Sequence, residues 1–216
     1  MVEVFELPLF PLNTVLFPGM FLPLHIFEER YKEMINLCLT EKRPFGVVYI
    51  AAGTAENGPL PEPHRVGCTA QITQMQPLSD GRMNIMSVGQ DRFRILSLSH
   101  QRPYLVGQVE LAPFTPEQDV TLTQASDQLR PLVLQYLDIL AHLGKVEFDK
   151  SQIPTDPHTL IYLAASLLQV STEQKQDFLT QDKASQLSLT LQRSYREEVS
   201  LLRLLPDNDD AAFSLN

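Results

Sequence analysis

The spacing of hydrophobic positions changes once along the chain, near residue 112. Before that point, apolar residues form short continuous runs or alternate with polar ones, which is typical of β-strands. After it, they recur every three or four positions, which is typical of amphipathic helices. We therefore predict an α+β protein whose first part is rich in strands and whose second part is helical.

Residues 6–31 contain four prolines between short apolar runs: Pro8, Pro11, Pro18 and Pro23. Proline lacks a backbone donor and fixes φ, so it is tolerated at strand edges, strand ends and turns but not inside helices. The stretch is therefore predicted to form two short strands, joined by a corner at residues 13–14 and a turn at Pro18-Gly19.

The rest of the first part follows from the same two periodicities. A helix is predicted over residues 28–40 and a surface loop, rich in Gly, Pro and Glu, over residues 53–64. Asp80-Gly81 favours a hairpin turn because both residues accept positive φ, and Gly89-Gln90-Asp91 indicates a bulge or bend. Further strands are predicted over residues 45–52, 66–76, 82–99 and 104–111. About six strands and one helix are the proportions of a small, closed or nearly closed β-barrel.

The second part is predicted to be a set of helices. Residues 117–143 have helical apolar spacing interrupted by Pro131, which predicts a kink or two abutting helices. Asp156-Pro157 favours a helix start, with Asp as the N-cap and Pro at the first position. Residues 171–174 have the sequence of a capping box, and residues 183–205 present one apolar face.

Composition narrows the class of protein. The chain has 216 residues, 44% of them hydrophobic, and a formal net charge of −9, so it has enough apolar residues for a core. The acidic balance disfavours binding to nucleic acid or to anionic membranes. No apolar run is long enough to span a membrane, and Glu3 and Glu6 disfavour a signal peptide. Two cysteines suit a reducing compartment, so we expect a soluble, cytoplasmic protein.

Candidate catalytic and metal-binding groups are few. His25 and Glu28 have the spacing of a metal-binding pair, but no third ligand accompanies them, so a histidine at a strand–helix junction is favoured. Cys68 has no basic neighbour and is interpreted as a structural thiol. Ser166 is expected to bond to its own helix backbone. We therefore predict no catalytic, cofactor-binding or metal-binding residue.

The most charged part of the strand region contains Asp91, Arg92 and Arg94. We interpret this segment as a solvated rim or as a set of local ion pairs, and an anion-binding site is the alternative.

Three stretches of the first part resemble the N-terminal, substrate-binding domain of the Lon protease family. They are LPLFPLNTVLFPGMFLPLHIFEERYKEMI, VGCTAQITQMQPLSDGRMNIMSVGQDRFRIL and RPYLVGQVEL, in this order. The resemblance is clear over residues 5–112 and continues weakly to about residue 205. It implies a PUA-like β pseudobarrel over residues 1–114, a C-terminal helical bundle over residues 115–205 and a short acidic tail over residues 206–216.

The resemblance also implies a function. The chain contains no GxxxxGK[ST] phosphate loop and no peptidase segment with a Ser-Lys pair, so it resembles a stand-alone substrate-binding domain without the ATPase and peptidase modules. We expect a non-catalytic protein- or peptide-binding module, an adaptor in proteolysis or protein quality control. Its expected partners are unfolded or apolar polypeptide segments, or a protease or chaperone. RNA binding, known for other PUA-like barrels, and peptidase activity of its own are the alternatives.

Two groups of residues are candidates for peptide binding. Phe17, Met20 and Phe21 flank the predicted turn, and turns lie at surfaces, so these side chains are candidates for an exposed apolar cluster, although aromatic residues are more often part of a core. Tyr104 and Tyr136 are candidates for a groove at the junction of barrel and bundle.

Overall fold

The computed structural model describes residues 3–54, 60–144 and 149–204, which form two compact units. The sheet unit comprises Met1–Phe114 together with Gln169–Asp182, and the helical unit comprises Thr115–Leu168 together with Lys183–Asn216. The first boundary lies where the sequence changes from strand to helical spacing. Residues 169–182, which sequence analysis assigns to the helical bundle, are grouped with the strands instead. The predicted tail, residues 206–216, lies outside the described residues.

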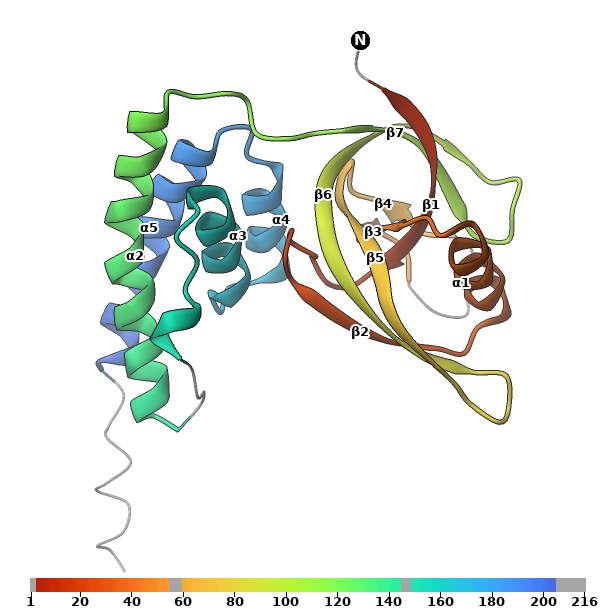
Figure 1. The fold of residues 1–216 in the computed structure, drawn as a ribbon, viewed down its shortest axis with the longest axis horizontal. Helices are drawn as coiled ribbons and strands as arrows, with labels where there is room; N and C mark the ends of the chain where they lie inside the picture. The colour runs from red at the N-terminus through yellow and green to blue at the C-terminus, as the bar shows by residue number, and fades with distance from the viewer. Residues whose placement is uncertain (1–2, 55–59, 145–148, 205–216) are drawn as a thin grey trace, which may run out of the picture. The chain divides into compact units, whose positions relative to one another are not determined.

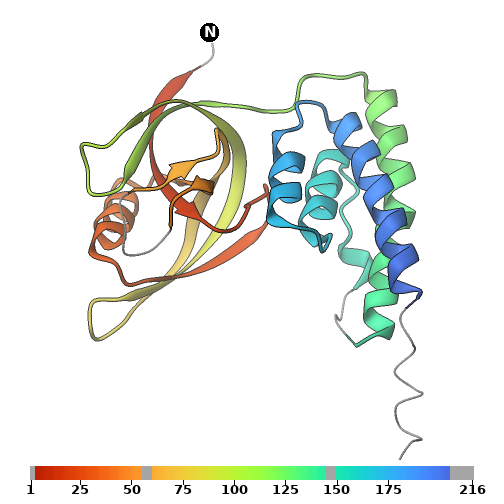
Figure 2. The same cartoon turned by 180° about the vertical axis from the view of Figure 1, so that it is seen from behind.

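The described part of Met1–Phe114 contains seven strands and the helix α1, Glu29–Glu41. The strands are β1 (Val4–Leu12), β2 (Phe21–Ile26), β3 (Phe45–Ala52), β4 (Glu62–Pro63), β5 (Val66–Pro77), β6 (Met83–Ser99) and β7 (Leu105–Leu111). They are joined in the order β1-β7-β6-β5-β3-β4, and β1 also pairs with β3, which closes the path on itself (Figures 1 and 2). The β1–β3 pairing is parallel and the others are antiparallel.

The proline-rich opening stretch forms the two strands, the corner and the turn expected of it. β1 ends before a bend at residues 13–14, and β2 follows a turn at residues 18–19 where Gly19 has φ 81°. Residues 15–17 form no strand, although their side chains are buried. These residues are apolar because their side chains pack into the core. An apolar run in the sequence does not show whether the backbone also pairs with a neighbouring strand.

The predicted hairpin and bulge are both present. Leu78 donates its N–H to the Arg82 carbonyl at 2.8 Å across the turn, and Gly81 has φ 79°. In the β5–β6 ladder, Cys68 pairs with Arg92 and Ala70 with Gly89, so β6 contains more residues than β5 between these pairs. This irregularity lies in the segment where the sequence predicts a bulge.

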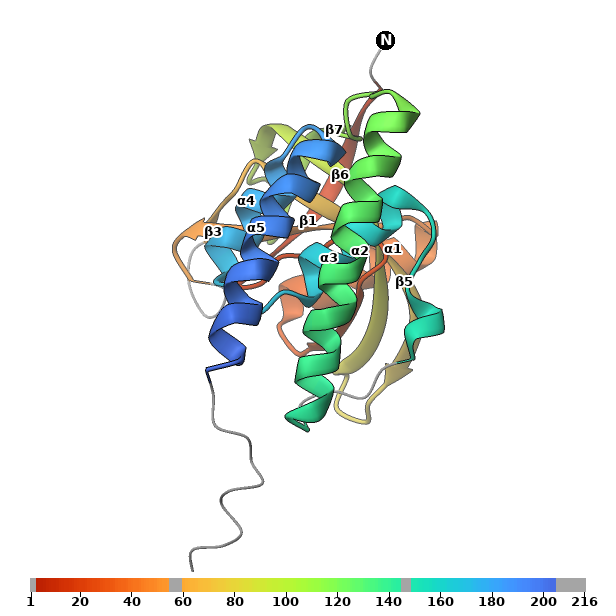
Figure 3. The ribbon, with the colours of Figure 1, turned by 90° about the vertical axis from the view of Figure 1, so that its left-hand side faces the viewer.

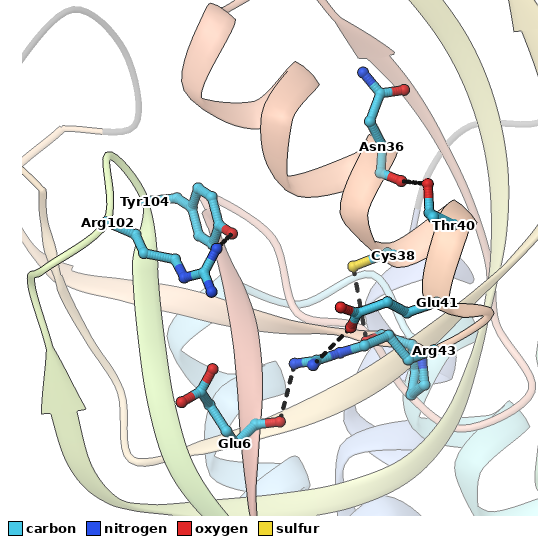
Figure 4. A network of polar contacts seen from close by, with 9 residues as sticks. Glu6, Asn36, Cys38, Thr40, Glu41, Arg43, Arg102 and Tyr104 are labelled. Atoms are coloured by element: carbon cyan, nitrogen blue, oxygen red, sulfur yellow. Dashed lines mark hydrogen bonds and ion pairs between the residues drawn. The ribbon is translucent and has the colours of Figure 1, made fainter.

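Helix α1 packs one face into the larger of two hydrophobic clusters of the sheet unit, through Tyr31, Met34, Ile35 and Cys38. Its C-terminal end is fixed to β1 by Arg43. The Arg43 guanidinium donates to the Glu6 carbonyl oxygen at 3.1 Å and to the Glu41 carboxylate at 3.1 Å (Figure 4). The end of α1 is therefore connected to the first half of β1.

Helix α4, Thr172–Thr180, belongs to the sheet unit and is bonded to its strands. It begins with the predicted capping box of Ser171 and Gln174. Its Gln176 side-chain amide donates to the Val66 carbonyl at 3.0 Å, and the Tyr49 hydroxyl donates to the Glu173 carboxylate at 2.7 Å. These bonds fix a segment that is distant in sequence to β3 and β5.

The helical unit is built from α2 (Asp119–His142), the short 3₁₀ helix η1 (Lys150–Gln152), α3 (Pro157–Leu167) and α5 (Ala184–Leu202). Helices α2 and α5 lie side by side (Figure 3). Pro131 lies inside α2, which is one continuous helix rather than two. Asp156 caps α3 as predicted, because its carboxylate accepts the Thr159 N–H at 2.8 Å. Among the described residues, no helix has both the length and the hydrophobicity of a membrane span.

Candidate functional site

Strand β2 has one free edge in the described structure. It pairs with β6 through Phe21 to Ile26, and no described strand pairs with its other side (Figure 1). Gly89 donates its N–H to the Met20 carbonyl at 3.0 Å. In an antiparallel ladder, residues whose backbone groups bond to the partner strand alternate with residues whose groups point away, so this bond shows which residues of β2 are which. The backbone groups of Leu22 and Leu24 then face β6, and those of residues 21, 23 and 25 face outward. Pro23 suits an outward position because it has no N–H to leave unpaired.

The side chains of β2 also divide into two sets. Leu22 and Ile26 are buried in the core, while Phe21, Pro23 and His25 are exposed. The Phe21 side chain is 66% exposed, and Phe27, just beyond the strand, is 45% exposed. Two exposed phenylalanines on one short edge are unusual, because a Phe side chain gains most from burial. They make the strand a candidate binding surface.

A hollow of about 160 Å³ lies between the end of β1, the second half of β2 and the start of α1. Its walls include Phe10, Leu24, Phe27 and Tyr31. The Phe10 and Tyr31 rings stack with their centroids 4.1 Å apart, so one wall is a rigid aromatic pair.

A second hollow of about 490 Å³ lies where β2 meets the outer parts of β5 and β6. Met75 and Met86 line it, and Leu24 and His25 line both hollows. The two hollows and the exposed phenylalanines thus form one largely apolar strip, which we call the β2 edge site. It comprises Phe10, Phe21, Pro23, Leu24, Phe27, Tyr31, Met75 and Met86.

Two titratable side chains at the β2 edge site, His25 and Glu28, both have polar partners. The His25 Nδ1 lies 2.7 Å from the Asn84 Oδ1, so the ring donates to the amide oxygen. The Glu28 carboxylate forms an ion pair with Arg30 at 2.8 Å. His25 and Glu28 therefore have partners other than each other, and among the described residues no three metal-ligating side chains gather. The site offers hydrophobic surface and backbone hydrogen bonds rather than charge.

The structure brings only part of the first predicted peptide-binding cluster to the surface. Phe21 is exposed and Met20 is half-buried, but the Phe17 side chain is 0% exposed. The Phe17 backbone packs so closely on β6 that a Cβ at Gly89 would lie 2.3 Å from the Phe17 carbonyl oxygen. The expectation of an exposed Phe17 is therefore corrected: this ring belongs to the interior.

The second predicted pair is also corrected by burial. Tyr104 is 0% exposed and its hydroxyl accepts a hydrogen bond from Arg102 at 3.2 Å (Figure 4). Tyr136 is 1% exposed and packs edge-on against Tyr195, with ring centroids 5.2 Å apart. Each tyrosine fills the core of its own unit, so neither ring is available at a surface.

Sequence reasoning missed Phe10, Leu24, Phe27 and Met75 as members of the site. The available signal was Pro23 in the middle of a strand pattern, which indicates an edge strand. An edge strand with apolar residues at alternating outward positions is a candidate for pairing with another chain.

Arg92 is not part of a solvated rim. Arg92 is 3% exposed, and its guanidinium donates to the Ala112 carbonyl at 3.1 Å and to the Gln181 carbonyl. It also lies over the Phe114 ring, 4.6 Å from the centroid. Arg94, in contrast, is at the surface and pairs with Glu110 and Asp182, each at 3.5 Å. Arg92 therefore connects β6 to the end of the α4 segment, and Arg94 forms the local ion pairs expected of this segment.

The candidate nucleophiles are held in structural roles. Burial raises the pKa of the Cys68 thiol, which donates to the Thr69 carbonyl at 3.4 Å. Burial also raises the pKa of Cys38 to about 11. The Ser166 hydroxyl donates to the Leu163 carbonyl of its own helix at 2.8 Å, as expected. Both thiols are therefore protonated at neutral pH, which makes them poor nucleophiles.

Comparison with known proteins identifies relatives over most of the chain. The family model described as the ATP-dependent protease La (LON) substrate-binding domain matches residues 6–192. The Lon protease of Flavobacterium johnsoniae is 26% identical over 206 residues, which cover 94% of this chain and 25% of that protein. The Lon protease of Desulfovibrio desulfuricans is 29% identical over 203 residues, which cover 88% of this chain and 22% of that protein. The chain thus spans about a quarter of the length of these relatives.

Two solved structures share the fold. The Lon N-terminal domain protein from Xanthomonas campestris matches with a TM-score of 0.56 and 24% identity, covering 94% of this chain and 99% of that one. The N-terminal domain of the Mycobacterium avium complex Lon protease matches with a TM-score of 0.67 and 16% identity, covering 89% and 98%. Since the family model matches most of the sequence and these domains match the fold, the chain belongs to the family of LON substrate-binding domains.

Proposed function

We propose that this chain is a non-catalytic module that binds extended, apolar polypeptide segments along β2. The observation that carries the proposal is the free edge of β2 with exposed Phe21 beside two apolar hollows. The family's description as a substrate-binding domain supports polypeptide as the ligand. In the cell, the module serves as a cytoplasmic adaptor in proteolysis or protein quality control, delivering such segments to a protease or chaperone.

Strand addition explains how one surface accepts many sequences. A segment that pairs with the outer side of β2 bonds to backbone groups, which every sequence has. The outward carbonyls of Phe21, Pro23 and His25 accept, and the outward N–H groups of Phe21 and His25 donate. Pro23 removes the central donor of this edge, which limits pairing of β2 with a second copy of itself.

Apolar contacts add preference for unfolded segments. Covering a Phe side chain fully is worth about 1.5–3 kcal/mol, so Phe21 and Phe27 together offer several kcal/mol to a client that covers both. Folded proteins present few such segments in extended form, whereas unfolded chains present many. The acidic net charge of −9 supports a protein ligand over RNA.

We also propose a PUA-like pseudobarrel for residues 1–114 and a helical bundle formed within residues 115–205 by α2, α3 and α5, with residues 169–182 joined to the strands. The closed strand path β1-β7-β6-β5-β3 supports the first part of this assignment, and the packing of α2 against α5 supports the second. The match of residues 6–192 to a substrate-binding domain supports a binding role, rather than a catalytic one, for these residues.

Serine substitution of Phe21 tests the proposed function. Phe21→Ser removes the exposed ring of β2, and Leu111→Ser is the matched control, because Leu111 is a 42% exposed residue at the end of β7. We expect Phe21→Ser to weaken binding of a fluorescently labelled, permanently unfolded protein about tenfold, measured by fluorescence anisotropy. Leu111→Ser should bind like the wild type. Unchanged binding by Phe21→Ser, with the thermal unfolding curve also unchanged, would remove β2 as the binding surface.

A further inference from the structure

The side chains of β2 alternate between two faces without interruption. Residues 21–26 pair with β6 in one continuous register. His25 lies opposite Asn84 in this ladder, and the His25 Nδ1 is 2.7 Å from the Asn84 Oδ1, so side chains that are opposite each other lie on the same face. Successive residues of a strand point to opposite faces. Phe21 and Leu24, which are three positions apart, therefore lie on opposite faces of β2.

The face that carries Phe21 is exposed and apolar at one end. The Phe21 side chain is 66% exposed, Pro23 on the same face is exposed, and Val88, opposite Phe21 in β6, is half-buried. A strand that pairs with the free edge of β2 places one of its side chains opposite Phe21 on this face, because opposite residues of neighbouring strands share a face. A large apolar side chain at that position covers part of the exposed ring.

The face that carries Leu24 leads into the smaller hollow of the β2 edge site. Leu24 shares this face with buried Leu22 and Ile26, and it is a half-buried wall of the hollow. The other described wall residues come from the end of β1, from β2 and from residues 27–31, and none of them belongs to β6. The hollow therefore lies on the free side of β2. A strand added at this edge carries the side chain opposite Leu24 to the hollow.

The hollow has the size of one large apolar side chain. Its volume is about 160 Å³, and a dry apolar cavity of about 150 Å³ is large enough to bind benzene. Phe10, Leu24 and Phe27 give it apolar walls. Glu28, the one carboxylate among the described wall residues, is already paired with Arg30 at 2.8 Å, so a basic side chain finds no free partner there. A leucine or phenylalanine side chain fits both the space and the walls.

We propose that β2 selects extended segments in which two large apolar side chains are three positions apart. One side chain covers Phe21 on the first face, and the other enters the hollow beside Leu24 on the second face. Two residues that are two or four positions apart point to the same face of a strand, so they cannot make both contacts. This rule holds for a parallel and for an antiparallel segment, because the spacing is the same in both directions. The inference rests on the proposed function and names the spacing that defines its substrate class.

Peptides of identical composition test this spacing. Three peptides of equal length carry two leucines in a threonine host, placed two, three or four positions apart. We expect the peptide with a spacing of three to bind the full chain about tenfold more tightly than either of the others, measured by NMR titration, because it alone makes both apolar contacts at once. Similar affinities for the three peptides would overturn the proposal.

Phe21→Ser supplies the decisive comparison. The variant loses one of the two contacts, so we expect it to bind the three peptides with similar affinity. Leu111→Ser, a surface change at the end of β7, should keep the preference of the wild type. A preference for the spacing of three that persists in Phe21→Ser, or that is lost equally in Leu111→Ser, would show that the two contacts lie elsewhere on the chain and that the proposal is wrong.

The two proposals can fail separately. If Phe21→Ser weakens binding of unfolded protein while the wild type binds the three peptides equally, the spacing rule is wrong and β2 remains the binding surface. If the wild type prefers the spacing of three and Phe21→Ser loses this preference but still binds unfolded protein normally, the spacing rule stands for short peptides and the proposed function is wrong.

Discussion

Replacing Arg92 should detach the α4 segment from the strands to which it is bonded. The Arg92 guanidinium is nearly inaccessible and donates to two carbonyl oxygens, one of Ala112 and one of Gln181. Arg92→Ala leaves both oxygens without this donor and removes the contact with the Phe114 ring. We expect the change to release residues 169–182 while the strand pairings of β6 persist.

The free-energy cost of Arg92→Ala can be estimated from the bonds that are lost. A hydrogen bond to a charged group contributes about 1.5–3 kcal/mol, and two of them together with a buried cation–π contact give roughly 3–5 kcal/mol after partial rehydration of the carbonyls. Arg94→Ala is the matched control, two residues away on the same strand. Its side chain is 46% exposed and pairs with carboxylates at the surface, so its loss should cost less than about 1 kcal/mol.

Hydrogen exchange followed by mass spectrometry measures this effect locally. Amides of α4 should exchange about a hundredfold or more faster in Arg92→Ala, since roughly 3 kcal/mol corresponds to more than two powers of ten in the opening equilibrium. Arg94→Ala should leave their exchange close to that of the wild type. Equal protection of α4 in the two variants would refute the view that Arg92 fixes this segment.

Two further predictions concern stability. Cys38 has a pKa raised by burial from 9.0 to about 11, so the folded state favours the neutral thiol. The stability that comes from keeping the Cys38 thiol neutral is fully present below pH 9 and is lost as the pH rises toward 11. At pH 11 the free energy of unfolding should be lower by about 2 kcal/mol. A Cys38→Ala variant measured in urea should lack that part of the decline, and an identical pH profile in the variant would contradict the assignment. Ser171→Ala removes the capping box of α4 and should destabilise that helix by about 1 kcal/mol, measured by hydrogen exchange, whereas exposed Ser200→Ala on α5 should have little effect.

Elements that depend on local sequence were predictable. The helix starts at Asp156-Pro157 and at Ser171 depend on capping bonds that span three residues, and the hairpin turn at Gly81 depends on a backbone angle that glycine adopts readily. The apolar spacing likewise predicts the helices and most strands. When one face of a helix or strand is buried, apolar residues recur with the repeat of that element.

Features that depend on partners distant in the sequence were not predictable. Arg92 looks like a surface residue until Gln181, 89 positions later, supplies a carbonyl beside it. Phe17 and Phe21 are equally apolar in sequence, and only the close approach of Phe17 to Gly89 places one inside and leaves the other exposed. The β2 edge site was found only in part for the same reason, since its walls come from four separate strands and a helix.

The assignment of Gln169–Asp182 to the sheet unit has a consequence for how the protein forms during synthesis. The strands end at Leu111, but the carbonyl of Gln181 that bonds to Arg92 and the Gln176 amide that bonds to Val66 leave the ribosome much later. Through that interval the buried arginine lacks one of its partners. The nascent sheet can therefore pair its strands early, yet it reaches its final stability only after α2, η1, α3 and α4 have emerged.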